Sequence, residues 1–121
     1  MTNKEIAIDF LNRISAGDVR PAYEEFVHPE FIHHNVYFKG DRESLMVGME
    51  ENAQEFPEKT YETLRALEDG NLVTVHGRVQ LAADSIWSVI HLFRFEDGKI
   101  IELWEASQEE IEDSPNENGL F

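Results

Sequence analysis

The stretch from Ser85 to Gln108, SIWSVIHLFRFEDGKIIELWEASQ, constrains the fold of this chain more than any other part of it. Two long segments rich in β-branched and aromatic residues flank Glu96-Asp97-Gly98. Because Gly tolerates positive φ angles and Asp favours turns, this pattern predicts a β-hairpin.

The kind of turn decides which side chains share a face of this hairpin. A three-residue loop with Gly98 in a left-handed bulge position pairs Phe95 with Lys99 and puts the odd-numbered residues of both strands together. A two-residue turn at Asp97-Gly98 would pair Glu96 with Lys99 and flip the parity of one strand. We favour the three-residue loop because it gives one largely apolar face, made of Trp87, Val89, His91, Phe93, Phe95, Ile101, Leu103 and Glu105.

His91 and Glu105 are the only strongly polar members of that face. An acid and an imidazole on an otherwise apolar sheet face form a candidate functional site, and everything about it depends on the turn at Gly98. By the same parity, the opposite face also carries apolar side chains, namely Ile86, Ile90, Leu92, Ile100, Trp104 and Ala106.

Composition excludes several classes of function. A length of 121 residues predicts one domain with a core of its own. The absence of cysteine removes disulfides, thiol catalysis and thiolate metal sites. A formal net charge of -15, with the acids spread along the chain, repels phosphate backbones and anionic membranes, so we expect no nucleic-acid or membrane partner.

The N-terminal residues, MTNKEIAIDF, carry acids where a signal peptide would be basic and then apolar. No apolar run approaches the roughly 20 residues that cross a bilayer. We therefore expect a cytoplasmic protein.

The first half of the chain has helical periodicity. Thr2 and Glu5 form a capping box before a helix that ends at Gly17. Asp18 begins a second, short helix that runs to His28-Pro29, and Asp41 caps a third that stops at Pro57. Between the last two, Phe31 to Asn35 reads as a short strand and residues 36–40 as a loop.

The second half of the chain has the two-residue period of strands, over Thr60 to Glu68, Leu72 to Leu81, Ser85 to Glu96 and Lys99 to Gln108. We therefore predict an α+β domain over residues 1–108, with three N-terminal helices packed on a curved antiparallel sheet that leaves a pocket between them. Residues 109–121 are expected to form an acidic tail, whose apolar end, Leu120-Phe121, either docks in a groove or frays.

The order of these elements, together with the phrase FRFEDGKIIELWE over residues 93–105, resembles the SnoaL-like polyketide cyclases of the NTF2-like superfamily. It is most similar to proteins described as SnoaL-like aldol-condensation enzymes, which carry Gln-His-Asn where this chain has His33-His34-Asn35. The resemblance implies the cone-shaped NTF2-like fold. It also implies a homodimer, in which a second subunit covers the outer sheet face.

The resemblance further implies cofactor-free acid–base chemistry on a small apolar carbonyl compound, of aldol-condensation, cyclisation or isomerisation type. The family's carboxylate after the Trp is matched by Glu105 and its assisting imidazole by His91, so these are the predicted catalytic residues. Leu103 replaces the family's His before the Trp. We expect burial to raise the pKa of Glu105 towards neutrality.

The predicted substrate-binding residues are His34, Asn35, Tyr37, Trp87 and Leu103, with His34 rather than His33 facing the pocket. We expect no metal, because the adjacent histidines lack a third ligand at a characteristic spacing. Two other functions remain open. The first is a non-catalytic domain that binds a small molecule, and the second is an interaction module that serves dimerisation.

Overall fold

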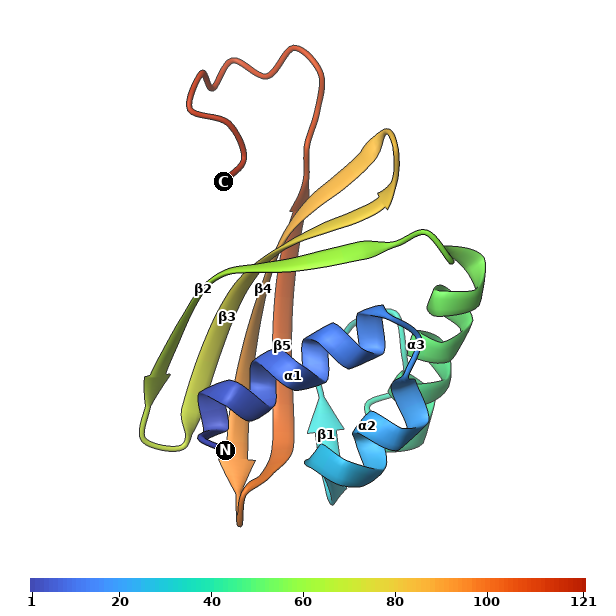
Figure 1. Cartoon of the computed structure of the whole chain (residues 1–121), viewed down its shortest axis with the longest axis vertical. Helices are drawn as coiled ribbons and strands as arrows, with labels where there is room; N and C mark the ends of the chain where they lie inside the picture. The colour runs from blue at the N-terminus through green and yellow to red at the C-terminus, as the bar shows by residue number, and fades with distance from the viewer.

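The computed structural model describes all 121 residues and confirms the predicted α+β class. Three helices, α1 (Asn3–Ser15), α2 (Val19–Phe26) and α3 (Arg42–Glu55), pack on one face of a five-stranded sheet. The strands are β1 (Val27–His33), β2 (Thr60–Asp69), β3 (Leu72–Ala82), β4 (Ser85–Glu96) and β5 (Lys99–Glu109). The β3–β4 turn and the tail after β5 extend beyond the part of the sheet that the helices cover (Figure 1).

Local sequence signals place the helix starts. The Thr2 hydroxyl accepts a hydrogen bond from the backbone N–H of Glu5, and the Glu5 carboxylate accepts one from the backbone N–H of Thr2, which completes the predicted capping box. Asp41 caps α3 through the backbone N–H of Ser44. These bonds satisfy N–H groups that have no partner within the helix. None of the three helices is long and apolar enough to span a membrane.

The sheet has the order β1-β5-β4-β3-β2, and β1 lies parallel to β5. Strands β2 to β5 form an antiparallel meander, as predicted, and only the edge strand β1 departs from that arrangement. The second helix also ends earlier than predicted, because Val27 begins the strand that runs through Pro29. Proline is tolerated there because β1 is an edge strand, where one side needs no N–H donor.

The turn of the β4–β5 hairpin is the two-residue form, so the preference for a three-residue loop was wrong. Asp97 and Gly98 both have positive φ, 52° and 75°, and Glu96 pairs with Lys99. Positive φ at both positions defines a type I′ turn, whose twist matches that of the strands. As a result Ile100, expected on the outer face, is fully buried in the core.

A β-bulge then restores the predicted parity. Phe95 pairs with Ile100 but Arg94 pairs with Glu102, so β5 has one extra residue, Ile101, at this point. Beyond the bulge the odd-numbered residues of both strands again share the inner face, which leaves His91 directly opposite Glu105.

The core lies between the helices and the inner sheet face. It contains 17 buried apolar residues, with Phe10, Tyr23 and Phe93 in edge-to-face contacts at its centre. After β5 the chain has no further helix or strand. Its last side chain, Phe121, lies beside His76 and under the guanidinium of Arg78, on the outer face of β3.

Candidate active site

The pair His91 and Glu105 occupies the inner face of the sheet, where β4 and β5 run side by side. Nε2 of His91 is 3.3 Å from Oε2 of Glu105. The two residues were expected to lie diagonally across the hairpin, but the strand register puts them directly opposite each other. Directly opposed side chains in an antiparallel pair are the closest neighbours that a sheet offers.

Asn35 holds the other oxygen of the carboxylate. It follows β1, and its Nδ2 donates to Oε1 of Glu105 over 2.5 Å. Its own Oδ1 accepts a hydrogen bond from the backbone N–H of Tyr37, which keeps the amide oriented. Both oxygens of Glu105 therefore face a nitrogen, and the pairing of β1 with β5 is what brings the third residue into reach.

Surrounding groups lower the pKa of Glu105. Burial is the largest single effect and raises it, but the hydrogen bonds and charges of His91, Asn35 and His33 together outweigh burial. The expectation of a raised pKa was wrong, because hydrogen bonds to the ionised form compete with desolvation. Glu105 is consequently a carboxylate near neutral pH, which suits it to accept a proton.

A small cavity of about 160 Å³ opens beside this pair. Its wall is formed by α1, α3, the segment before β2, and the strands β2, β3, β4 and β5. The apolar lining residues are Leu11, Ile14, Met49, Val79, Leu81 and Val89, and the polar ones are Ser15, Asn52, Lys59, Tyr61, His91 and Glu105. A cavity of this size accommodates a molecule about as large as benzene.

His34 faces away from the cavity, so the expectation that it faces inward was wrong. Its ring stacks on Trp104, with centroids 5.1 Å apart, and its Nε2 is 2.7 Å from Oε2 of Glu102 on the outer side of the sheet. His33 is the histidine that points inward. Its Nδ1 accepts from the Asn35 N–H and its Nε2 donates to the Lys39 carbonyl.

Three other predicted binding residues do not line the cavity. Tyr37 is 86% exposed, on the loop after β1. Trp87 lies near the start of β4, where its Nε1 donates to the Ser85 hydroxyl. Leu103 is buried in the core beneath the site. The cavity therefore receives His91 and Glu105 from the predicted set, with Asn35 in contact behind them.

Sequence reasoning missed the opposite side of the cavity. Asn52 lies in the last turn of α3, Lys59 lies in the segment after that helix, and Tyr61 is at the start of β2. Gly77 allows Tyr61 to lie there, since a Cβ at Gly77 would be 2.4 Å from the Tyr61 ring. A glycine in the middle of a predicted strand was the available signal, because such a residue marks a close approach.

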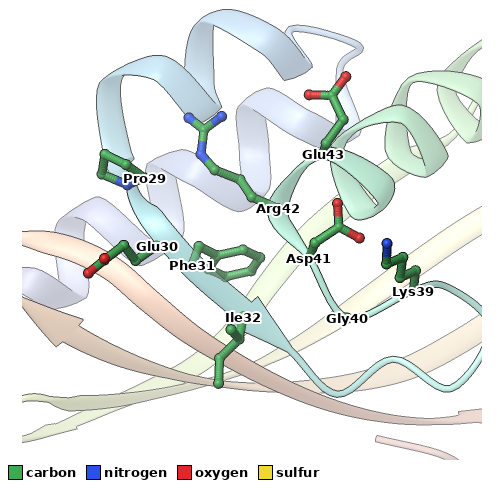
Figure 2. A pocket seen from close by; sticks show the side chains of 9 residues that line it. All are labelled: Pro29, Glu30, Phe31, Ile32, Lys39, Gly40, Asp41, Arg42 and Glu43. Atoms are coloured by element: carbon green, nitrogen blue, oxygen red, sulfur yellow. The ribbon is translucent and has the colours of Figure 1, made fainter.

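A second, wider depression of about 630 Å³ lies outside the sheet, between β1 and the start of α3 (Figure 2). Its residues already serve the fold. Asp41 caps α3, and Nη2 of Arg42 donates to the Tyr23 carbonyl oxygen. It contains none of the predicted site residues. No group of three or more His, Asp or Glu side chains in the chain is arranged to hold a metal ion.

Comparison with known proteins identifies the family. The SnoaL-like domain matches residues 7–103, most of the chain, so this protein belongs to the SnoaL-like family. No curated protein sequence matches it. The resemblance noted from residues 93–105 is thereby confirmed.

Solved structures establish the NTF2-like fold. An NTF2-like protein of unknown function from Cytophaga hutchinsonii has 17% identity and a TM-score of 0.72, with 89% of this chain and 91% of that one covered. IdmH from Streptomyces antibioticus, a candidate polyketide cyclase, has 18% identity, a TM-score of 0.73 and coverages of 89% and 93%. AclR from Streptomyces galilaeus, a candidate hydroxylase, has 17% identity, a TM-score of 0.74 and coverages of 88% and 88%. The named activities differ, so this likeness defines the fold and leaves the reaction to the site.

Proposed function

We propose that this SnoaL-like protein is an enzyme that performs acid–base chemistry on a small carbonyl compound, without a cofactor, in the cavity beside Glu105. The observation that carries the proposal is the arrangement of His91, Glu105 and Asn35 at an apolar cavity. The reaction type would be aldol condensation, cyclisation or isomerisation, each of which begins by removing a proton from the carbon next to a carbonyl group.

Each residue has a distinct part in that step. The ionised Glu105 accepts the proton, because its pKa lies below the usual range for a glutamate. Asn35 fixes one carboxylate oxygen and so orients the other. The other ring nitrogen of His91, Nδ1, is buried without a partner. Because the proton on Nε2 faces the Glu105 carboxylate, Nδ1 of the neutral ring is an acceptor, and the part of His91 is to orient the carboxylate.

Hydrogen–deuterium exchange tests the proposal without knowledge of the natural substrate. Butan-2-one is incubated with the protein in D₂O, and loss of its α-proton signals is followed by NMR. Replacement Glu105→Gln removes the base and is expected to lower the catalysed exchange by roughly 10²- to 10⁴-fold. Glu62→Gln, on the exposed side of β2, is the matched control and should exchange at the wild-type rate. Equal rates for wild-type protein and Glu105→Gln would refute the proposed base.

A non-catalytic binding domain is the second candidate. It is favoured by the two contacts of Glu105, since a carboxylate with both oxygens engaged and a lowered pKa is a weaker base. In that case butan-2-one, or a ring compound of similar size, would bind and raise the melting temperature while α-proton exchange stayed at the rate of buffer alone.

We also propose that two copies of the chain associate through the outer sheet face, as the third candidate, an interaction module, would require. Ile90 at the centre of that face is 49% exposed and Leu67 on β2 is 71% exposed. Apolar side chains grouped on one face of a sheet mark an interaction surface, and a second copy would bury them.

A further inference from the structure

Lys59 differs from the other three lysines of the chain in its surroundings. Lys4 and Lys39 are exposed, and Lys99 is half-buried with its Nζ donating to the Glu25 carbonyl, whereas Lys59 lines the cavity that also contains His91 and Glu105. Its place follows from the chain path. The helix α3 ends at Glu55, shortly before Pro57, and β2 begins at Thr60. Between them, the backbone N–H of Lys59 donates to the Phe56 carbonyl in a turn. The side chain is thereby directed along the end of the helix towards the cavity.

The amino group of Lys59 has no carboxylate partner, although the chain contains 25 acids. None of the ion pairs in the structure involves Lys59. Instead Nζ donates to Oδ1 of Asn52 over 2.6 Å. This neutral acceptor lies seven residues earlier, in the last turn of α3. Burial lowers the pKa of Lys59, and no neighbouring charge opposes this effect. A lysine amine that is partly desolvated and has no carboxylate partner is more often in its neutral, nucleophilic form than one in water.

We propose that Lys59 is the covalent carbonyl-binding residue of this cavity, and that it forms an iminium with small ketones or aldehydes whose α-proton Glu105 then removes. This inference deepens the proposed function and rests on it. It assigns the substrate class as carbonyl compounds small enough for a cavity of about 160 Å³.

The chemistry balances with water and protons alone. The neutral Nζ adds to the carbonyl carbon, and a proton moves from nitrogen to oxygen to give a carbinolamine. That oxygen takes up one more proton and leaves as water, so a protonated C=N bond remains. Transfer of the α-proton to the Glu105 carboxylate gives a neutral enamine. Reaction of the enamine at its α-carbon, followed by addition of water, returns the free amine. The positive charge of the iminium makes the α-proton more acidic, which compensates for the weak base that a low pKa gives.

Reductive trapping tests the covalent step directly in the wild-type protein. The chain is incubated with butan-2-one and sodium cyanoborohydride near pH 7, which converts an iminium into a stable secondary amine by adding hydride to its carbon. Peptide mass spectrometry then measures the modification of each lysine. We expect Lys59 to be labelled severalfold faster than Lys4 and Lys39, because it lines the cavity that holds the ketone and because burial lowers its pKa. Labelling of Lys59 no faster than these two would overturn the inference.

Two variants separate this inference from the proposed function. Lys59→Arg keeps the positive charge but cannot form an iminium, so this variant should lose α-proton exchange of butan-2-one. Exchange at the wild-type rate would show that only the charge of Lys59 matters, and it would overturn the covalent role. Glu105→Gln should still be trapped at Lys59 while it loses exchange. Trapping at Lys59 in a wild-type protein that shows no exchange would leave the iminium site standing and remove the enzyme function instead.

Discussion

At the scale of single residues, the setting of Glu105 decides what the site can do. A buried carboxylate with no partners would have a raised pKa and act as an acid near neutral pH. Here the contacts of His91 and Asn35 reverse that direction, so Glu105 is ionised near neutral pH, as the proposed base must be. The family's His before the Trp is replaced by Leu103, which packs in the core, and the imidazole in contact with the carboxylate is that of His91 on β4.

Replacing Asn35 by Leu tests this account of the pKa. The change removes one of the contacts that lower the pKa of Glu105, so we expect that pKa to rise towards or above its ordinary value of 4.5. The measurement is an NMR titration of the Glu105 carboxyl carbon in wild-type protein and in Asn35→Leu. Asn116→Leu, in the tail, is the control and should leave the titration unchanged.

The same variant should alter how stability depends on pH. A carboxylate whose pKa is lowered by folding stabilises the native state above its unfolded pKa, and that contribution is lost as pH falls through the folded pKa. Urea unfolding between pH 7 and pH 3 should therefore show a smaller loss of stability on acidification in Asn35→Leu than in wild-type protein. An identical pH dependence would mean that Asn35 does not act on Glu105.

Which parts of the site the sequence could predict follows from the range of the contacts. His91 and Glu105 were identified because both belong to one hairpin, but their shared face was predicted from the wrong turn and is set by the bulge at Ile101. His33 and His34 were exchanged because the direction of a short edge strand depends on its partner, β5, which lies far along the chain. Lys59 carried no local signal at all, since only the packing of α3 on the sheet brings it to the cavity.

At the scale of secondary-structure elements, the β4–β5 hairpin sets the register on which the site depends. Its I′ turn requires positive φ at both central residues, and Gly98 meets that requirement without strain. Alone, this turn would have left Glu105 on the wrong side. The extra residue at Ile101 corrects the parity before the strand reaches the site.

Gly98→Ala isolates the contribution of the turn. A Cβ at Gly98 meets no other atom within 4 Å, so the cost of the substitution comes from backbone conformation alone. We expect a loss of about 1 kcal/mol in the free energy of unfolding, measured by urea denaturation. Asp97→Asn is the matched control, because Asn tolerates positive φ well, and should be at least as stable as wild-type protein. Equal stability of Gly98→Ala would argue against the I′ turn.

The elements themselves were largely predictable, because caps, turns and periodicity are local. Thr2 and Asp41 start their helices as expected, and the bounds of the four meander strands, β2 to β5, agree to within one residue. The turn type was not, because the same Asp97-Gly98 sequence suits either loop. The choice made from apolar parity could not include a bulge that the sequence does not mark.

At the scale of the whole molecule, the two faces of the sheet differ in their cover. The helices bury the inner face, whereas the outer face keeps apolar side chains such as Ile90 in contact with solvent. Only the end of the tail, through Phe121, lies against part of it. The proposed homodimer would complete the burial.

Ile90→Glu should convert this dimer into monomers. The substitution places a charge at the centre of the proposed interface, where it would be desolvated without a partner. Sedimentation velocity at micromolar concentration should show a dimer for wild-type protein and a monomer for Ile90→Glu. Val36→Glu adds the same charge on the exposed loop after β1 and should remain dimeric. A wild-type protein that sediments as a monomer would rule out the interface.

The parallel pairing of β1 with β5 has a consequence for folding. Asn35 and Glu105, which this pairing brings together, are 70 residues apart in the sequence, so closing the loop between them costs more chain entropy than forming any hairpin of the meander. We expect the site to assemble in the last step of folding. Because Trp104 stacks on His34 at the same junction, its fluorescence in a Trp87→Phe variant should change after the backbone signal of the sheet has formed. Coincident changes in the two signals would instead indicate that the junction and the meander form together.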